Sequence, residues 1–166
     1  MKRSLKLVIK FIQIFFALCL SAFISGCAPK TYEKNQSYFI LIKTPLLKYA
    51  DLGYIRSTSD EVRVDLFIAG QLIQSIEIDT LVCVNEGCLT KSAFNKAYLH
   101  ESYPKNLLLN VLLGRPIFAK ASFELTSLGF RQVLQSSEYN IEYKVENGEI
   151  FFKDSHNKLK IKIFKN

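Results

Sequence analysis

Apolar and polar residues alternate in three stretches of this chain, 61–68, 138–145 and 158–164, with exceptions only at Phe67 and Phe164. A period of two is typical of a strand that buries one face and leaves the other in water. Short turn sequences such as Ala69-Gly70-Gln71 and Asn147-Gly148 lie next to these runs, so we expect antiparallel hairpins. Less regular apolar runs predict further strands at 38–43, 52–56, 72–78, 80–84, 129–135 and 149–154.

The pattern changes to a helical period between residues 90 and 116. Thr90 is suited to begin a first helix as its N-cap, with Phe94 and Tyr98 one turn apart. A second helix is expected to have Pro104 in its first turn and to end before Gly114. Its apolar stripe consists of Leu107, Leu108, Val111 and Leu112.

A long sheet with one apolar face must cover that face. With only two short amphipathic helices available, the economical arrangement is a sheet that curves around them. The sequence therefore predicts an α+β fold, mostly antiparallel β, in which a curved sheet or incomplete β-barrel is covered by short helices. We place this fold in a single β-rich domain at residues 37–166 and expect a monomer. If the cover is incomplete, the remaining cavity is apolar and suits a lipid-like ligand.

The start of the chain has the pattern of an export signal. The first ten residues contain four basic side chains and no acidic one, and residues 11–24 are almost wholly apolar. This run is too short to span about 30 Å of hydrocarbon comfortably as a helix. We therefore interpret residues 1–26 as a signal peptide.

The apolar run ends in Ile24-Ser25-Gly26-Cys27, which resembles the bacterial lipobox. The resemblance implies that Cys27 is acylated and that residues 27–36 form a lipidated tether to the membrane. An ordinary signal peptide that happens to end near a cysteine is the alternative. Ala28 follows the cysteine, and the lack of aspartate at this position favours the outer membrane, on its periplasmic face.

Charge and cysteine content agree with export. The chain has 22 Lys and Arg against 15 Asp and Glu, but four of the basic residues belong to the signal, which leaves a net charge of only +3. We expect no nucleic-acid partner on this ground. Beyond Cys27 only Cys83 and Cys88 remain. We predict a disulfide between them, with a redox pair or half of a metal site as the alternatives.

Residues with catalytic chemistry are sparse. His100 and His156 are isolated among polar residues, and no nucleophile, zinc or phosphate-loop motif is present. Glu142 and Glu149 could face each other across a hairpin, although such carboxylates are usually just solvated. We therefore expect a binding or scaffold protein rather than an enzyme, with no cofactor and no metal site.

Several short motifs resemble the LolB outer-membrane lipoprotein receptors and their soluble relatives, the LolA carriers. The second helix ends in Leu113-Gly114-Arg115-Pro116-Ile117, and a Gly-containing turn at 85–90 precedes the first helix. Gln132 or Gln135 then precedes the aromatic strand 139–143. The resemblance implies a receptor that accepts acylated lipoproteins from a LolA-like carrier into an apolar cavity and passes them to the membrane.

The resemblance also implies where cargo would bind. The cavity would be lined by Val62, Val64, Leu66, Ile76, Ile78, Tyr139, Ile141, Tyr143, Ile161 and Ile163, under a lid of Phe94, Leu108 and Leu112. LolB receptors project an apolar loop at the membrane, and the matching segment here carries Ile68 and Leu72. An ordinary hairpin with both residues in the core is the alternative.

A different class of function stays open on the same residues. The chain would then be a non-catalytic envelope lipoprotein that assists a larger complex as a structural or assembly accessory. It would bind that complex through a sheet edge or through the face that carries Lys158, Lys160 and Lys162. The cavity-lining residues would in that case form a filled core.

Overall fold

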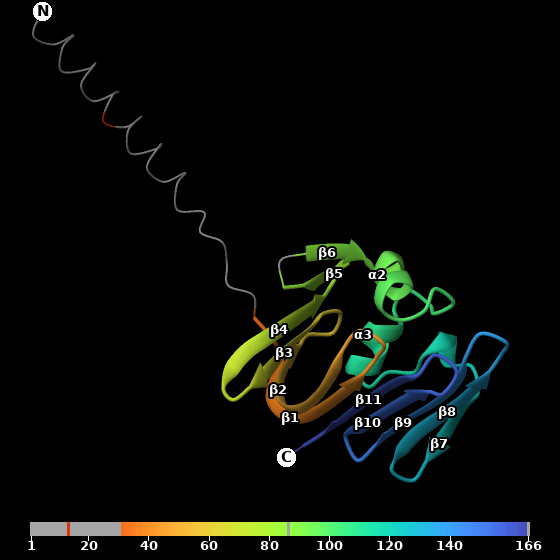
Figure 1. Ribbon diagram of the computed structural model, residues 1–166. Coiled ribbons are helices and arrows are strands. Elements are labelled where there is room, and N and C mark those ends of the chain that lie inside the picture. The colour runs from red at the N-terminus through yellow and green to blue at the C-terminus, as the bar shows by residue number, and fades with distance from the viewer. Residues whose placement is uncertain (1–12, 14–30, 86, 166) are drawn as a thin grey trace, which may run out of the picture. The chain divides into compact units, whose positions relative to one another are not determined.

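Eleven strands form one antiparallel sheet in the order β6-β5-β4-β3-β2-β1-β11-β10-β9-β8-β7 (Figure 1). This is a computed structural model that describes residues 13, 31–85 and 87–165. The first strand and the last pair with each other in the middle of the sheet. We therefore distinguish a first half of the sheet, β1–β6, and a second half, β7–β11. The predicted signal peptide and Cys27 lie outside the described residues.

The observed elements confirm the predicted mostly antiparallel sheet with few, short helices. The strands are β1 (Lys34–Lys43), β2 (Lys48–Ser57), β3 (Val62–Ile68), β4 (Gln71–Ile78), β5 (Leu81–Val84), β6 (Gly87–Thr90), β7 (Phe123–Thr126), β8 (Gly129–Gln135), β9 (Asn140–Glu146), β10 (Glu149–Asp154) and β11 (Leu159–Phe164). The helices are α2 (Lys91–Tyr98), α3 (Leu107–Leu112) and the short 3-10 turn η1 (Phe118–Lys120).

Four elements differ from the sequence prediction. The strands β6 and β7 were not expected, because they are four residues long and their exposure does not alternate. The strand β1 begins at Lys34, since this residue already pairs with Ser57 of β2. The helix α3 begins at Leu107, so Pro104 lies before it and accepts a hydrogen bond from the Leu107 backbone N–H.

The predicted start of the first helix and the predicted end of the second are confirmed. The Thr90 hydroxyl caps α2 by accepting a hydrogen bond from the Ala93 backbone N–H at 3.2 Å. After α3, Gly114 has a φ of +65° and lies at the C′ position. Its N–H donates to the Val111 carbonyl, and the Arg115 N–H donates to the Asn110 carbonyl. This is the Schellman arrangement, which favours glycine because the C′ residue is left-handed.

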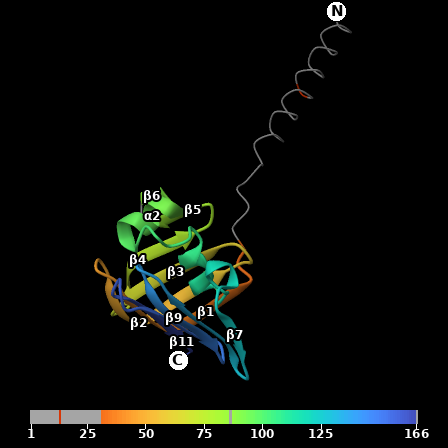
Figure 2. The same ribbon diagram turned by 90° about the vertical axis from the view of Figure 1, so that its right-hand side faces the viewer.

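The sheet curves around α3, and α2 lies near β5 and β6 (Figures 1 and 2). Alternate residues of the strands point into this curve and pack against the helices, as their near-zero exposure indicates. Every core residue that the structure describes lies in the unit from Tyr32 onward. We therefore expect residues 32–166 to fold without the preceding segment.

The predicted disulfide is present. Cys83 of β5 and Cys88 of β6 are opposite each other in the strand register and are joined through their sulfur atoms. A ring this small contributes about 2 kcal/mol to the free energy of unfolding in the chain-entropy model. Separately, none of the described helices is both long and apolar enough to cross a membrane.

Candidate binding site under the helices

An apolar hollow of about 120 Å³ lies between the helices and the first half of the sheet. Six of the predicted cavity residues line it: Val64, Ile76, Phe94, Leu108, Leu112 and Ile161. The β1–β2 hairpin contributes Thr44, Leu46 and Leu47 to the same wall. The sequence did not predict that this hairpin lines the hollow, because its place there depends on how β1 and β2 curve in the folded sheet.

The other predicted cavity residues occupy different places. Ile163 lines a second hollow, and Tyr139 is partly buried, with its ring 4.9 Å from that of Phe118. The remaining five line neither hollow and belong to the closely packed core: Val62, Leu66, Ile78, Ile141 and Tyr143. For these five the structure favours a filled core over a cavity wall.

The second hollow has a volume of about 610 Å³ and meets the first at Leu112, which lines both. One part of its wall is apolar and includes Val145, Ile150 and Ile163. Polar residues from the start of β1, the β2–β3 turn and the end of α3 form the rest. Lys34, Ser57, Ser59, Arg115 and Lys165 are among them. This hollow could not be predicted from the sequence, because the residues that line it come from separate segments of the chain.

The motif fragments that suggested a family resemblance contact one another. The Gln132 side chain is fully buried; its oxygen accepts from the Ile117 N–H at 2.8 Å, and its amide donates to the Ile117 and Ala121 carbonyls at 3.0 and 2.6 Å. The Tyr143 hydroxyl donates to the Arg115 carbonyl at 3.0 Å. Burial raises the pKa of Tyr143, which therefore stays a neutral donor. Together these bonds fasten the segment after α3 to β8 and β9.

A second buried group fastens the connection between α2 and α3. The carboxylate of Asp154, at the end of β10, accepts hydrogen bonds from the Tyr103 hydroxyl and from the Asn157 amide at 2.9 Å. It also accepts from the Asn140 backbone N–H at 3.0 Å. Burial alone would raise the pKa of Asp154, but these donors favour the charged form and hold its pKa below the ordinary value. Burial and the Asp154 carboxylate raise the pKa of Tyr103.

The hairpin between β3 and β4 presents apolar side chains to solvent. Ile68 is 52% exposed and Leu72 is 51% exposed, and the neighbouring Ile73 is also exposed. The interpretation that Ile68 and Leu72 belong to the core is therefore wrong. The pairing of β3 with β4 shifts register between Leu66 and Phe67, so that Ile68 is opposite Gln71 at the exposed tip.

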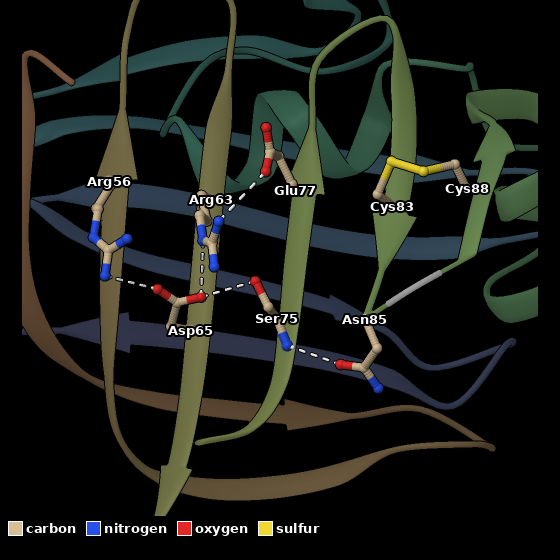
Figure 3. A network of polar contacts seen from close by, with 8 residues as sticks. All are labelled: Arg56, Arg63, Asp65, Ser75, Glu77, Cys83, Asn85 and Cys88. Carbon is tan, nitrogen blue, oxygen red and sulfur yellow. Dashed lines mark hydrogen bonds and ion pairs between the residues drawn. A yellow bond between two sulfur atoms is a disulfide. The ribbon is translucent and has the colours of Figure 1, made fainter. Parts of the chain in front are cut away.

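The outer face of the first half carries a polar network around a buried carboxylate (Figure 3). Asp65 is ion-paired with Arg56 at 2.9 Å and with Arg63 at 3.0 Å, and it accepts from the Ser75 hydroxyl at 2.8 Å. The hydrogen bond to Asp65 raises the pKa of Arg63. The bonds from Arg56 of β2 and Ser75 of β4 join their strands to Asp65 of β3, so the network stabilises the sheet.

The residues considered for catalysis are not brought together. His100 contacts Ser102 at 2.7 Å, and His156 lies in the β10–β11 turn. Glu142 and Glu149 do not face each other: Glu142 is opposite Lys153, and Glu149 is opposite Glu146. In the described part of the chain, no three His, Cys, Asp or Glu side chains are placed to hold a metal ion. The chain matches no family model, no curated protein and no solved structure.

Proposed function

We propose that this protein is an outer-membrane-anchored receptor that takes acylated lipoproteins from a periplasmic carrier and passes them to the membrane, as LolB-type receptors do. The fold would then be of the LolA/LolB kind, with lipid on Cys27 as the anchor. The observation that carries the proposal is the pair of adjoining hollows under α3. One of them is almost wholly apolar and the other has a polar rim.

The sizes of the hollows indicate how an acyl chain would enter. A cavity of about 150 Å³ holds a molecule the size of benzene, so the 120 Å³ hollow has room for only part of an acyl chain. The 610 Å³ hollow is in the range of ordinary ligand sites, roughly 300–1,000 Å³. Loading therefore requires Leu112 and its neighbours to move away from the sheet, which would join the two hollows.

The exposed hairpin tip is a second support. Ile68 and Leu72 are on the same end of the sheet as Leu46, which is 66% exposed and lines the rim of the apolar hollow. Exposed apolar side chains next to an apolar hollow suit a site where acyl chains pass between protein and bilayer. Transfer would be driven by burial of acyl chains in successive apolar sites, without catalysis.

Acyl-peptide binding by the isolated domain tests this proposal. We would measure the displacement of bis-ANS fluorescence from residues 32–166 by an acylated peptide and by the same peptide without acyl chains. We expect only the acylated peptide to displace the dye. A larger side chain at Gln74, which lines the apolar hollow, would fill that space. The Gln74→Trp variant should therefore weaken acyl-peptide binding at least about tenfold.

The matched control is Gln135→Trp, which adds the same side chain at an exposed position of β8 that lines neither hollow. It should leave acyl-peptide binding unchanged. Equal displacement by both peptides, or equal effects of both tryptophans, would remove the binding proposal. In cells, depletion should cause lipoproteins to accumulate in the wrong membrane. Normal lipoprotein sorting beside other envelope defects would instead favour the structural-accessory function.

A further inference from the structure

Four lysines lie side by side across four neighbouring strands, and we name them the lysine row: Lys48, Lys43, Lys160 and Lys153. The strand register places Lys43 of β1 directly opposite both Lys48 of β2 and Lys160 of β11. Lys160 in turn is opposite Lys153 of β10. Their neighbours along each strand are buried in the core: Tyr49, Ile42, Ile161 and Phe152. The row is therefore on the outer face of the sheet, away from the helices.

The lysine row concentrates positive charge that no described acidic side chain neutralises. Neighbouring strands are about 4.8 Å apart, and like charges directly opposite each other destabilise a sheet. Among the residues that the structure describes, no ion pair joins a member of the row to a carboxylate. Glu142 is opposite Lys153, but its carboxylate is bound to Lys144 at 2.6 Å. An external anion would relieve this repulsion.

Protection of a sheet edge does not explain the lysine row. Lysines commonly guard edge strands against pairing with other chains. The strands β2, β1, β11 and β10 are all interior strands, and the edges of the sheet are β6 and β7. Their backbone groups are already paired on both sides, so the charges have no edge to protect. Edge protection therefore does not account for these charges.

Apolar and aromatic side chains flank the lysine row on the same face. A shallow hollow of about 480 Å³ is lined by Lys43, Lys48 and Lys160, together with Leu41 and Ala50. The ammonium group of Lys160 is 5.8 Å from the centre of the Phe151 ring. On the same face of β2, two residues beyond Ala50, Leu52 is 43% exposed. Lysines beside exposed apolar groups are typical of surfaces that bind the boundary between lipid head groups and acyl chains.

We propose that the lysine row docks the domain on an anionic phospholipid bilayer, with lipid phosphates between Lys43, Lys48 and Lys160. The apolar neighbours favour a bilayer over a dissolved polyanion, since a dissolved polyanion would leave Leu52 in water. This docking surface is on the opposite side of the sheet from the hollows and does not depend on cargo binding. It holds the domain on the membrane surface in addition to any lipid anchor.

Vesicle flotation of residues 32–166, which lack Cys27, tests the proposal without an acyl chain. We would compare vesicles of phosphatidylcholine alone with vesicles that also contain phosphatidylglycerol. We expect binding only to the anionic vesicles, with a strong loss of binding as the salt concentration rises. A lysine near an anionic surface contributes a factor of about five to binding. The combined variant Lys43→Gln, Lys153→Gln and Lys160→Gln should therefore bind about a hundredfold more weakly.

The control is a second triple variant, which removes the same amount of positive charge outside these four strands: Lys96→Gln, Lys105→Gln and Lys120→Gln. It should retain binding within about threefold. Urea unfolding separates docking from folding: removal of the repulsion should leave the row variant at least as stable as the wild type. Equal losses in both variants would attribute binding to net charge and overturn the proposal. So would equal binding to both kinds of vesicle, or binding to dissolved polyphosphate but not to vesicles.

Discussion

The two halves of the sheet hold the helices by different means. The second half, β7–β11, uses buried hydrogen bonds. Gln132 and Tyr143 bond to the segment after α3, and the Tyr103 hydroxyl donates to the Asp154 carboxylate. The first half, β1–β6, contacts the helices through apolar side chains that enclose a hollow. Besides the local cap of α2 by Thr90, the Ser59 carbonyl of this half accepts a hydrogen bond from the Arg115 side chain.

This difference indicates how the site can open. Apolar contacts have no preferred direction, so a helix can slide or lift from them at moderate cost. A buried hydrogen bond cannot be lost in this way, because each unpaired group costs about 1–3 kcal/mol. We therefore expect the helices to move away from the first half of the sheet while remaining fastened to the second half. The apolar hollow is on the side where this movement would enlarge it.

The largest expected effect is at Gln132. The Gln132→Ala variant leaves the Ile117 N–H and C=O and the Ala121 carbonyl without their partner. It should lower the free energy of unfolding by about 3–5 kcal/mol, measured in urea. Gln135→Ala, at an exposed position of the same strand, should change it by less than about 0.5 kcal/mol. Similarly small losses in both variants would contradict the role of buried hydrogen bonds in holding the helices to the second half.

The second largest loss of stability is expected at Asp154, and it depends on pH. The Asp154→Asn variant replaces an acceptor of several hydrogen bonds by an amide, and we expect a loss of about 2–3 kcal/mol near neutral pH. The folded pKa of Asp154 is lowered, so the unfolded chain takes up the proton first. This stabilisation is complete above the unfolded pKa of about 4 and is lost as the pH falls through the folded pKa.

Urea unfolding at a series of pH values checks this prediction. The wild type should lose stability below about pH 4 more steeply than the Asn variant, and the two curves should converge in acid. Asp60→Asn, at an exposed turn position, is the control and should leave the acid dependence unchanged. Parallel curves for the wild type and Asp154→Asn would contradict the role of the charged form.

The smallest loss of stability is expected where the helix layer bonds to the first half of the sheet. The Arg115→Gln variant removes the hydrogen bond to the Ser59 carbonyl, which lies at an exposed position. We expect a loss below about 1 kcal/mol, because solvent can replace such a bond. A loss above about 2 kcal/mol in the same urea measurement would mean that both halves fasten the helices.

Local patterns predicted the elements whose causes are local. Thr90 and Gly114 mark the helix ends because a side-chain cap and a left-handed backbone depend on single residues. Alternation located β3 and β9. The short β6 and β7 escaped prediction because their pairing partners, and not their own pattern, make them strands. The interpretation that put Ile68 and Leu72 in the core was wrong, because the register shift between β3 and β4 cannot be predicted from alternation.

By itself, the sequence determined a β-rich domain with two short helices and a disulfide between Cys83 and Cys88, because periodicity, caps and cysteine spacing act over a few residues. Only the tertiary structure decided which apolar residues enclose a hollow and which fill the core. It also brought Lys48, Lys43, Lys160 and Lys153 into one row. The physical reason is that β1 pairs with β11, more than a hundred residues away along the chain, and the register of that pairing sets every neighbour across the middle of the sheet.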